Sequence, residues 1–181
     1  MPSIFTRPIV KITFIVINLF LPTKSILGQF FYRNVLSNEL EIKMPIDFKL
    51  IQSFAQDGKY PLANQPSEVY GNEQNTVNIA FKITKRKLDE KDVIKEGKIL
   101  EEQLAKDKNI RIIDSEVPII NGISSYIFSF YSDAKDTKVY NLIFIFSSKG
   151  RMVVGNFNCV IALQMNWQSS AFMIIHSLKR V

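Results

Sequence analysis

The stretch that decides the fold is a pair of apolar runs joined by a short polar turn, in residues 138–157, KVYNLIFIFSSKGRMVVGNF. The first run covers residues 138–146, the second covers residues 151–157, and Ser147-Ser148-Lys149-Gly150 lies between them. Two apolar runs that flank a short turn containing glycine are typical of a β-hairpin. We therefore expect two adjacent antiparallel strands here.

Further strands are expected upstream, because polar and apolar residues alternate there with the period of a half-buried strand. The clearest case is residues 76–84, in which Val77, Ile79, Phe81 and Ile83 share one face. The other expected strands are residues 38–44, 48–54, 110–117 and 123–131.

Two segments have the apolar spacing of helices, residues 88–106 and residues 159–178. In the first, Val93, Gly97, Leu100 and Leu104 form one stripe, and lysine and glutamate fill the remaining faces. Asp89 stands where a capping residue is expected. An order of strands, helix, hairpin-connected strands and helix predicts an α+β fold, an antiparallel sheet flanked by helices.

The amino terminus has the organisation of a secretory signal peptide. Arg7 and Lys11 precede an apolar core at residues 12–21, Pro22 follows it, and Gly28 fits the position before a cleavage site. The alternative is a buried strand or helix that starts the domain. A bilayer span needs ~20 apolar residues, so this core is too short for a stable anchor. We expect residues 1–28 to be removed on export and residues 29–181 to form a single periplasmic or extracellular domain.

The net charge of +6 gives little reason to expect a nucleic-acid partner. Three basic residues, Arg7, Lys11 and Lys24, lie in the predicted leader, which contains no acidic residue. About half of the positive charge is therefore lost with it, and what remains is an ordinary surface. We expect neither a nucleic-acid partner nor a stable membrane anchor.

Residues that commonly carry catalysis are sparse and scattered. Cys159 is the only cysteine and His176 the only histidine. Cys159 is expected at the start of the last helix, where it is either a reactive thiol or a small buried residue; we favour the second. One histidine does not make a multi-histidine zinc site. We therefore expect no catalytic residues, no metal and no cofactor, and a protein that is not an enzyme.

The last helix offers the most informative surface. Its expected core stripe comprises Val160, Leu163, Trp167, Ala171, Ile174 and Leu178. Ile161, Met165, Phe172 and Met173 lie away from this stripe, where a surface helix should carry polar residues. Either another segment covers them, or they form an exposed patch for a partner.

Residues 55–75 are rich in Gln, Asn, Pro and Gly, and are expected to form a long loop with at most a short edge strand. Tyr60 and Tyr70 lie in this segment. A closed apolar cavity between these two tyrosines and the sheet would indicate a carrier of a small ligand or a lipid.

The run from Tyr140 to Cys159, followed by a helix with Trp167, resembles the PsbP-like superfamily of Mog-, PsbP- and DcrB-type proteins. Residues 40–45, LEIKMP, followed by Phe48, are similar to the entry strand of that family. The resemblance implies an α/β/α sandwich, in a bacterial exported member, and no reaction, because members mostly bind proteins. The expected function is an exported, non-enzymatic domain that binds a protein or a cell-envelope component. The alternative is an extracytoplasmic carrier of a small ligand or a lipid.

Overall fold

The structure is a computed structural model that describes residues 29–51, 65–134 and 137–181. The predicted signal peptide and Tyr60 lie outside the described residues, so the predictions that rest on them stay predictions. Within the described ranges, no helix has both the length and the apolar character needed to cross a bilayer.

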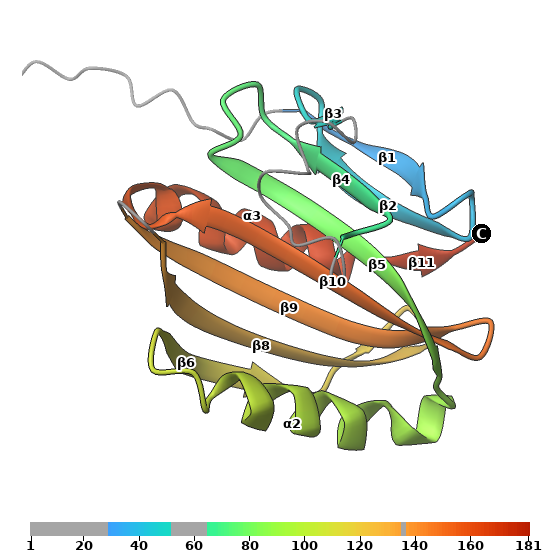
Figure 1. Cartoon of the computed structure of the whole chain (residues 1–181). Helices are drawn as coiled ribbons and strands as arrows, with labels where there is room; N and C mark the ends of the chain where they lie inside the picture. Colours follow the sequence, from blue (N-terminus) through green and yellow to red (C-terminus); the bar gives the residue numbers. More distant parts are fainter. Residues whose placement is uncertain (1–28, 52–64, 135–136) are drawn as a thin grey trace, which may run out of the picture.

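A large antiparallel sheet forms the middle of the molecule, with the strand order β3-β4-β5-β10-β9-β8-β6 (Figure 1). Its strands are β3 (Lys49–Leu50), β4 (Glu68–Gly71), β5 (Val77–Lys87), β6 (Ile110–Glu116), β8 (Ile123–Asp133), β9 (Lys138–Ser148) and β10 (Arg151–Val160), and β7 (Ile119–Ile120) pairs with β8. Every pairing is antiparallel. The predicted α+β fold with an antiparallel sheet is confirmed.

The predicted hairpin is β9 and β10, and it is longer than expected because Ser148 still pairs with Arg151. Only Lys149 and Gly150 remain in the turn, and both have positive φ angles, of 49° and 70°. This geometry is that of the tight turns whose twist matches two antiparallel strands. Gly155 is needed for a different reason: a Cβ atom there would lie 2.0 Å from the ring of Phe144.

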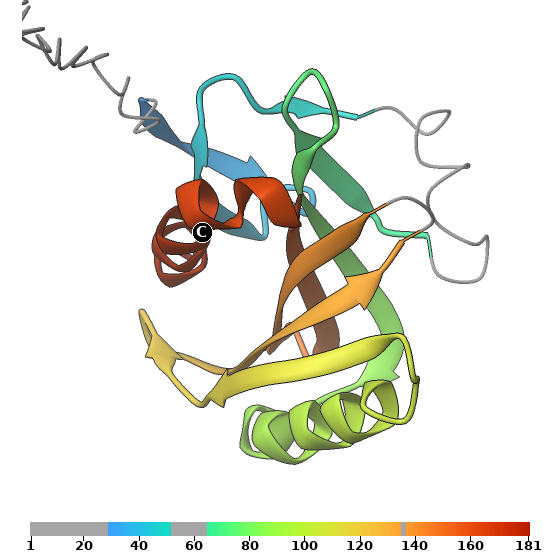
Figure 2. The same ribbon diagram turned by 90° about the vertical axis from the view of Figure 1, so that its left-hand side faces the viewer.

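Two layers pack on opposite faces of the large sheet (Figure 2). Helix α2 (Val93–Leu104) covers the outer face, and helix α3 (Gln164–His176) lies on the concave inner face. Beside α3 is a second sheet of β1 (Phe30–Val35), β2 (Leu40–Pro45) and β11 (Lys179–Arg180). The main core fills the space between the inner face, α3 and this second sheet, and a smaller core lies under α2.

The boundaries of both predicted helices need correction. Strand β10 runs through Val160, and a 3₁₀ turn at Ile161–Leu163 precedes α3. Cys159 therefore lies in a strand, opposite Tyr140 and Val77, and not at a helix start. The cause is that the inward–outward alternation of the strand continues past residue 157. Before α2, a 3₁₀ turn covers Glu90–Asp92, and Asp89 makes no side-chain capping bond.

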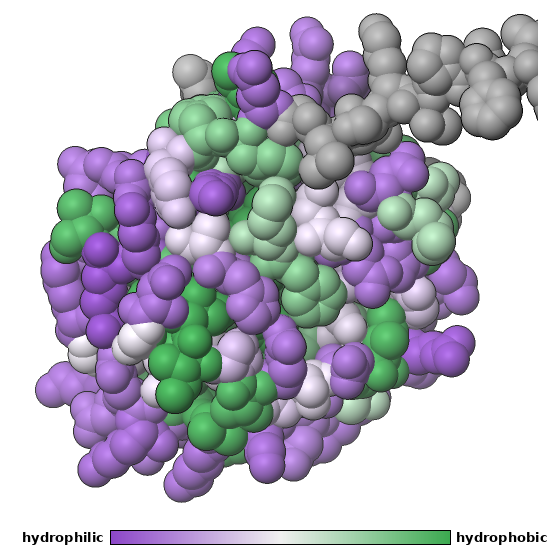
Figure 3. Space-filling model, turned by 180° about the vertical axis from the view of Figure 1, so that it is seen from behind, coloured by the Kyte–Doolittle hydropathy of each residue, from purple (hydrophilic) through white to green (hydrophobic). Residues whose placement is uncertain are grey.

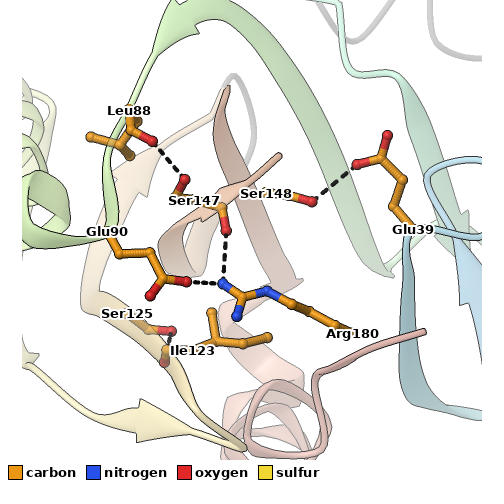
Figure 4. Close-up of polar contacts among 8 residues, drawn as sticks. All are labelled: Glu39, Leu88, Glu90, Ile123, Ser125, Ser147, Ser148 and Arg180. Atoms are coloured by element: carbon orange, nitrogen blue, oxygen red, sulfur yellow. Dashed lines mark hydrogen bonds and ion pairs between the residues drawn. The ribbon is translucent and has the colours of Figure 1, made fainter. Parts of the chain in front are cut away.

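A set of polar contacts, the hairpin-end clamp, holds the second sheet and the chain end against the β9–β10 turn (Figure 4). Glu39 accepts hydrogen bonds from Ser148, at 3.0 Å, and from Arg151, at 2.7 Å. Arg180 pairs with Glu90 across the same end of the sheet, and Ser147 donates a hydrogen bond to the Leu88 carbonyl. Because β11 follows α3 directly, this clamp also fixes the carboxyl end of α3.

Candidate binding surface

Helix α3 has a buried side that matches the predicted core stripe except at Val160, which belongs to strand β10 and lies outside the main core. Ile175, which the predicted stripe left out, is also buried. Trp167 is 7% exposed, and its ring lies 5.6 Å from that of Phe48 and 6.3 Å from that of Phe157. Ala171 and Ile174 are fully buried beside it. These contacts confirm that Trp167 anchors the helix in the main core.

The opposite side of α3 faces solvent without a charged residue. No Asp, Glu, Lys or Arg occurs between Gln164 and His176, or anywhere from Met152 to Leu178. Among the residues predicted as a patch, Met165 is 90% exposed, and Ile161 and Met173 are 36% and 37% exposed. The side of a helix that contacts only water usually carries charged side chains. An exposed side with methionines and no charge is therefore unusual.

Phe172 differs from the other three predicted patch residues, because it is only half-buried and packs against the main core. Its ring also lines a small hollow of about 50 Å³ between α3 and the large sheet. Ile127 and Leu142 contribute apolar lining to the hollow, and Asp114 and Glu116 contribute carboxylates. Phe172 therefore connects the helix surface to the sheet, and a polar substitution there would disturb the core.

Strand β6 continues the surface on the far side of this hollow. It is an edge strand, paired only with β8 among the described residues. Ile113, at a bulge, is 45% exposed, Val117 is 49% exposed and Ile119 of β7 is 77% exposed. Sequence reasoning did not single out these residues. A usable signal was the Ile112-Ile113 pair, which breaks the alternation of the strand.

Polar contacts tie α3 to this edge of the molecule at both ends of the helix. The Tyr131 hydroxyl donates to the Gln164 side chain at 3.0 Å, and His176 lies 3.3 Å from Glu116. We give the name α3–β6 surface to the exposed apolar residues of α3, of β6 and of the segments next to them. These residues are Ile161, Met165, Met173, Ile113, Val117 and Ile119. Viewed from behind, apolar side chains interrupt the polar surface on this side of the molecule (Figure 3).

The groups that sequence reasoning weighed for catalysis are poorly placed for it. Cys159 is 1% exposed, and burial raises the pKa of its thiol to about 11, so the reactive thiolate is disfavoured. Tyr140, which lies opposite Cys159 and was not weighed from the sequence, is also buried, and burial raises the pKa of its hydroxyl to about 12. His176 contacts one carboxylate, and no group of three metal-ligating side chains occurs in the described parts of the chain.

The carrier hypothesis placed Tyr70 in the wall of a cavity together with Tyr60, and this stays a prediction because Tyr60 lies outside the described residues. Tyr70 lies in strand β4, between β3 and β5, and is 6% exposed within the main core. Its hydroxyl donates a hydrogen bond to Glu68 at 2.9 Å, and the Arg33 guanidinium lies over its ring. Burial and the Glu68 carboxylate raise the pKa of Tyr70. The residue packs as core because its strand continues the large sheet.

Comparison by sequence finds no relative: no family model matches the chain, and no curated protein matches it. Comparison by structure does find similar folds. The cyanobacterial PsbP protein (CyanoP) of Synechocystis sp. PCC 6803 is similar with a TM-score of 0.58 and 12% identity, over 89% of this chain and 99% of that one.

The Ran-binding protein Mog1p of Saccharomyces cerevisiae is similar with a TM-score of 0.51 and 11% identity, over 85% of this chain and 96% of that one. LpqN of Mycobacterium tuberculosis, described as involved in cell envelope biogenesis, has a TM-score of 0.49 and 12% identity, over 83% and 90% of the two chains. Sequence identities this low show only that the folds are similar. Together with the antiparallel sheet between helices described above, the likenesses to the cyanobacterial PsbP protein and to Mog1p show that the chain has the Mog1/PsbP-like fold.

Proposed function

We propose that this protein is an exported, non-enzymatic binding protein that holds a protein partner on its α3–β6 surface. The observation that carries the proposal is the absence of charge on the exposed side of α3, where Met165 is 90% exposed. The centres of protein interfaces are depleted in charged residues and enriched in methionine and aromatic side chains. The flexible methionine side chain also adapts its shape to a partner.

The neighbouring edge strand supports the same proposal. β6 has backbone groups on its outer side that pair with no other described strand. A partner that reaches this edge can add main-chain hydrogen bonds to the apolar contacts made by Ile113 and Val117. The fitting partner is therefore a protein with an apolar, uncharged patch, next to a segment that can lie along a strand.

The fold is consistent with a binding role. Mog1p, which shares it, is described as a Ran-binding protein. Only the class of activity, protein binding, is carried over to this chain. Ran itself is no candidate partner for an exported protein.

The proposal can be tested by capture of partners from a cell-envelope fraction. The variant Met165→Asp/Met173→Asp places charge on the surface of α3, and Ile94→Asp is a matched control on α2, where Ile94 is 40% exposed. We expect the wild type and the control to retain the same protein, and the double variant to lose it. Equal capture by all three proteins would contradict the proposal, provided that circular dichroism shows each of them folded.

A further inference from the structure

The outer face of the large sheet changes from apolar to polar beyond the end of α2. Under the helix it is apolar, with Ile143, Ile145 and Met152 in the smaller core. Farther along the same strands, it carries four asparagines, which we name the carboxamide row: Asn78, Asn141, Asn156 and Asn158. In the strand register Asn158 lies opposite Asn78 on β5 and opposite Asn141 on β9. Three adjacent strands therefore present carboxamides side by side.

Three of these asparagines are buried, and Asn156 is partly exposed. Asn78 is 0% exposed, and Asn141 and Asn158 are each 6% exposed. The outward face of an antiparallel sheet ordinarily carries exposed polar side chains or apolar ones under a covering element. A buried set of neutral amides needs hydrogen-bond partners to be stable.

The hydrogen bonds within the row leave several atoms without a partner. Asn156 Nδ2 donates to Asn141 Oδ1 at 3.4 Å, and Asn141 Nδ2 donates to Ser132 Oγ at 2.9 Å and to the Val139 carbonyl at 3.2 Å. Neither Oδ1 nor Nδ2 of Asn78 has a partner among the described residues, and Asn156 Oδ1 has none either. Buried amides without hydrogen-bond partners destabilise the folded protein, so they do not serve stability. A role in function explains their presence.

An open hollow of about 230 Å³ lies on this face. Asn141, Asn156 and Asn158 of the carboxamide row line it, with Thr76, Ser132, Val139 and Val160 around them. None of the described residues that line it is charged. A phosphate, a carboxylate or a metal ion would find no opposite charge on these residues, and burial without one is unfavourable. The lining instead offers neutral donors and acceptors close together.

We propose that this hollow is a binding site for a neutral sugar, of one or two rings. A carboxamide carries a donor and an acceptor side by side, as do the neighbouring hydroxyls of a sugar, so the two can exchange paired hydrogen bonds. Val139 and Val160 supply apolar contacts for the C–H faces of a ring. The hollow is slightly smaller than the usual pocket for a drug-sized molecule, which fits a ligand of this size.

The sugar site is separate from the α3–β6 surface. α3 packs on the inner face of the large sheet, and the carboxamide row lies on the outer face. The two surfaces can therefore be occupied at once, and a failure of one proposal leaves the other standing.

The test uses the side-chain amide signals of the asparagines in a ¹H–¹⁵N NMR spectrum of the whole chain. The probes are sucrose, maltose and N-acetylglucosamine at millimolar concentrations. We expect at least one of them to shift signals of the carboxamide row, and Asn156→Ala to weaken its binding about tenfold. Asn109→Ala, at an exposed asparagine before β6, is the matched control and should leave the affinity unchanged.

A second variant separates a ligand site from a structural polar cluster. Asn78→Val removes two buried atoms that have no partner among the described residues, so it should raise the unfolding temperature without sugar. Because Asn78 is buried and does not line the hollow, the same variant should leave the affinity for sugar unchanged. The proposal is overturned if none of the three sugars shifts these signals. It is also overturned if Asn156→Ala binds as tightly as the wild type.

Discussion

The two helices cover opposite faces of one sheet, yet they present different surfaces to solvent. α2 buries Val93 and Gly97 and places five charged side chains on its remaining faces: Lys95, Glu96, Lys98, Glu101 and Glu102. α3 buries Trp167, Ala171, Ile174 and Ile175, and has no Asp, Glu, Lys or Arg on any face. Covering a sheet thus does not require an uncharged outer face. This difference supports the proposal that the outer side of α3 binds a partner.

The comparison implies that α3 is firmly held on its inner side, and Trp167→Ala tests this with the largest expected effect. The substitution removes ring contacts with Phe48 and Phe157 and leaves a cavity in the main core. We expect the free energy of unfolding to fall by about 3–5 kcal/mol, measured by urea denaturation. A loss below about 1 kcal/mol would show that α3 is only loosely attached.

On the other face, α2 is held close to the sheet by the absence of a side chain at Gly97. A Cβ atom there would lie 2.3 Å from the ring of Tyr126. Alanine favours a helix over glycine by about 1 kcal/mol, but overpacking destabilises by about 1–3 kcal/mol. Because the clash involves Tyr126 atoms next to the backbone, Gly97→Ala should destabilise the protein in thermal unfolding. A stabilised variant would mean that α2 can move away from the sheet without cost.

Acid should loosen the end of α3 through the hairpin-end clamp. Burial alone would raise the pKa of Glu39, but the Ser148 hydrogen bond and the charges of Lys149 and Arg151 outweigh it, so its pKa is lowered from 4.5. The ionised form is favoured in the folded state. Its contribution to stability is complete above the ordinary pKa and is lost as the pH falls through the lower, folded-state value.

The matched variant for this effect is Glu39→Gln, compared with the wild type across a pH series of urea unfolding. The wild type should be the more stable protein at neutral pH, and the difference should shrink below pH 4.5. A difference that stays constant with pH would show that the carboxylate charge does not contribute.

The smallest effect on stability is expected on the exposed face of α3. Met165→Ser/Met173→Ser changes side chains that are 90% and 37% exposed, so the free energy of unfolding should change by no more than about 0.5 kcal/mol. The same measurement on Ile94→Ser provides the reference for α2. A loss of several kcal/mol in the α3 variant would mean that these methionines serve the fold rather than a partner.

Local periodicity was enough to predict most of the fold, because strands and helices leave distinct repeats in the sequence. For this reason the sequence predicted the tight turn at Lys149 and Gly150 and the strand β5. Strand β1 was missed, because only Val35 is buried in it and alternation is weak. The end of β10 was misplaced, because Cys159 and Val160 are apolar in either a strand or a helix.

The candidate sites were less predictable, because they depend on which strands become neighbours. The exposed residues Met165 and Met173 follow from helical spacing alone. Ile113 and Val117 join them only because β6 is the last strand of the sheet. The carboxamide row depends on register as well, since Asn78 and Asn158 are distant in sequence and lie opposite each other in space.

The central claim is that the uncharged side of α3 is a binding surface. Site-specific photocrosslinking in the producing cell is its most direct test. A photoreactive residue is placed at position 165 on α3 or, as the matched control, at position 94 on α2. We predict a protein adduct of one defined mass from position 165 and none from position 94. No adduct from position 165, or the same adducts from both positions, would contradict the claim.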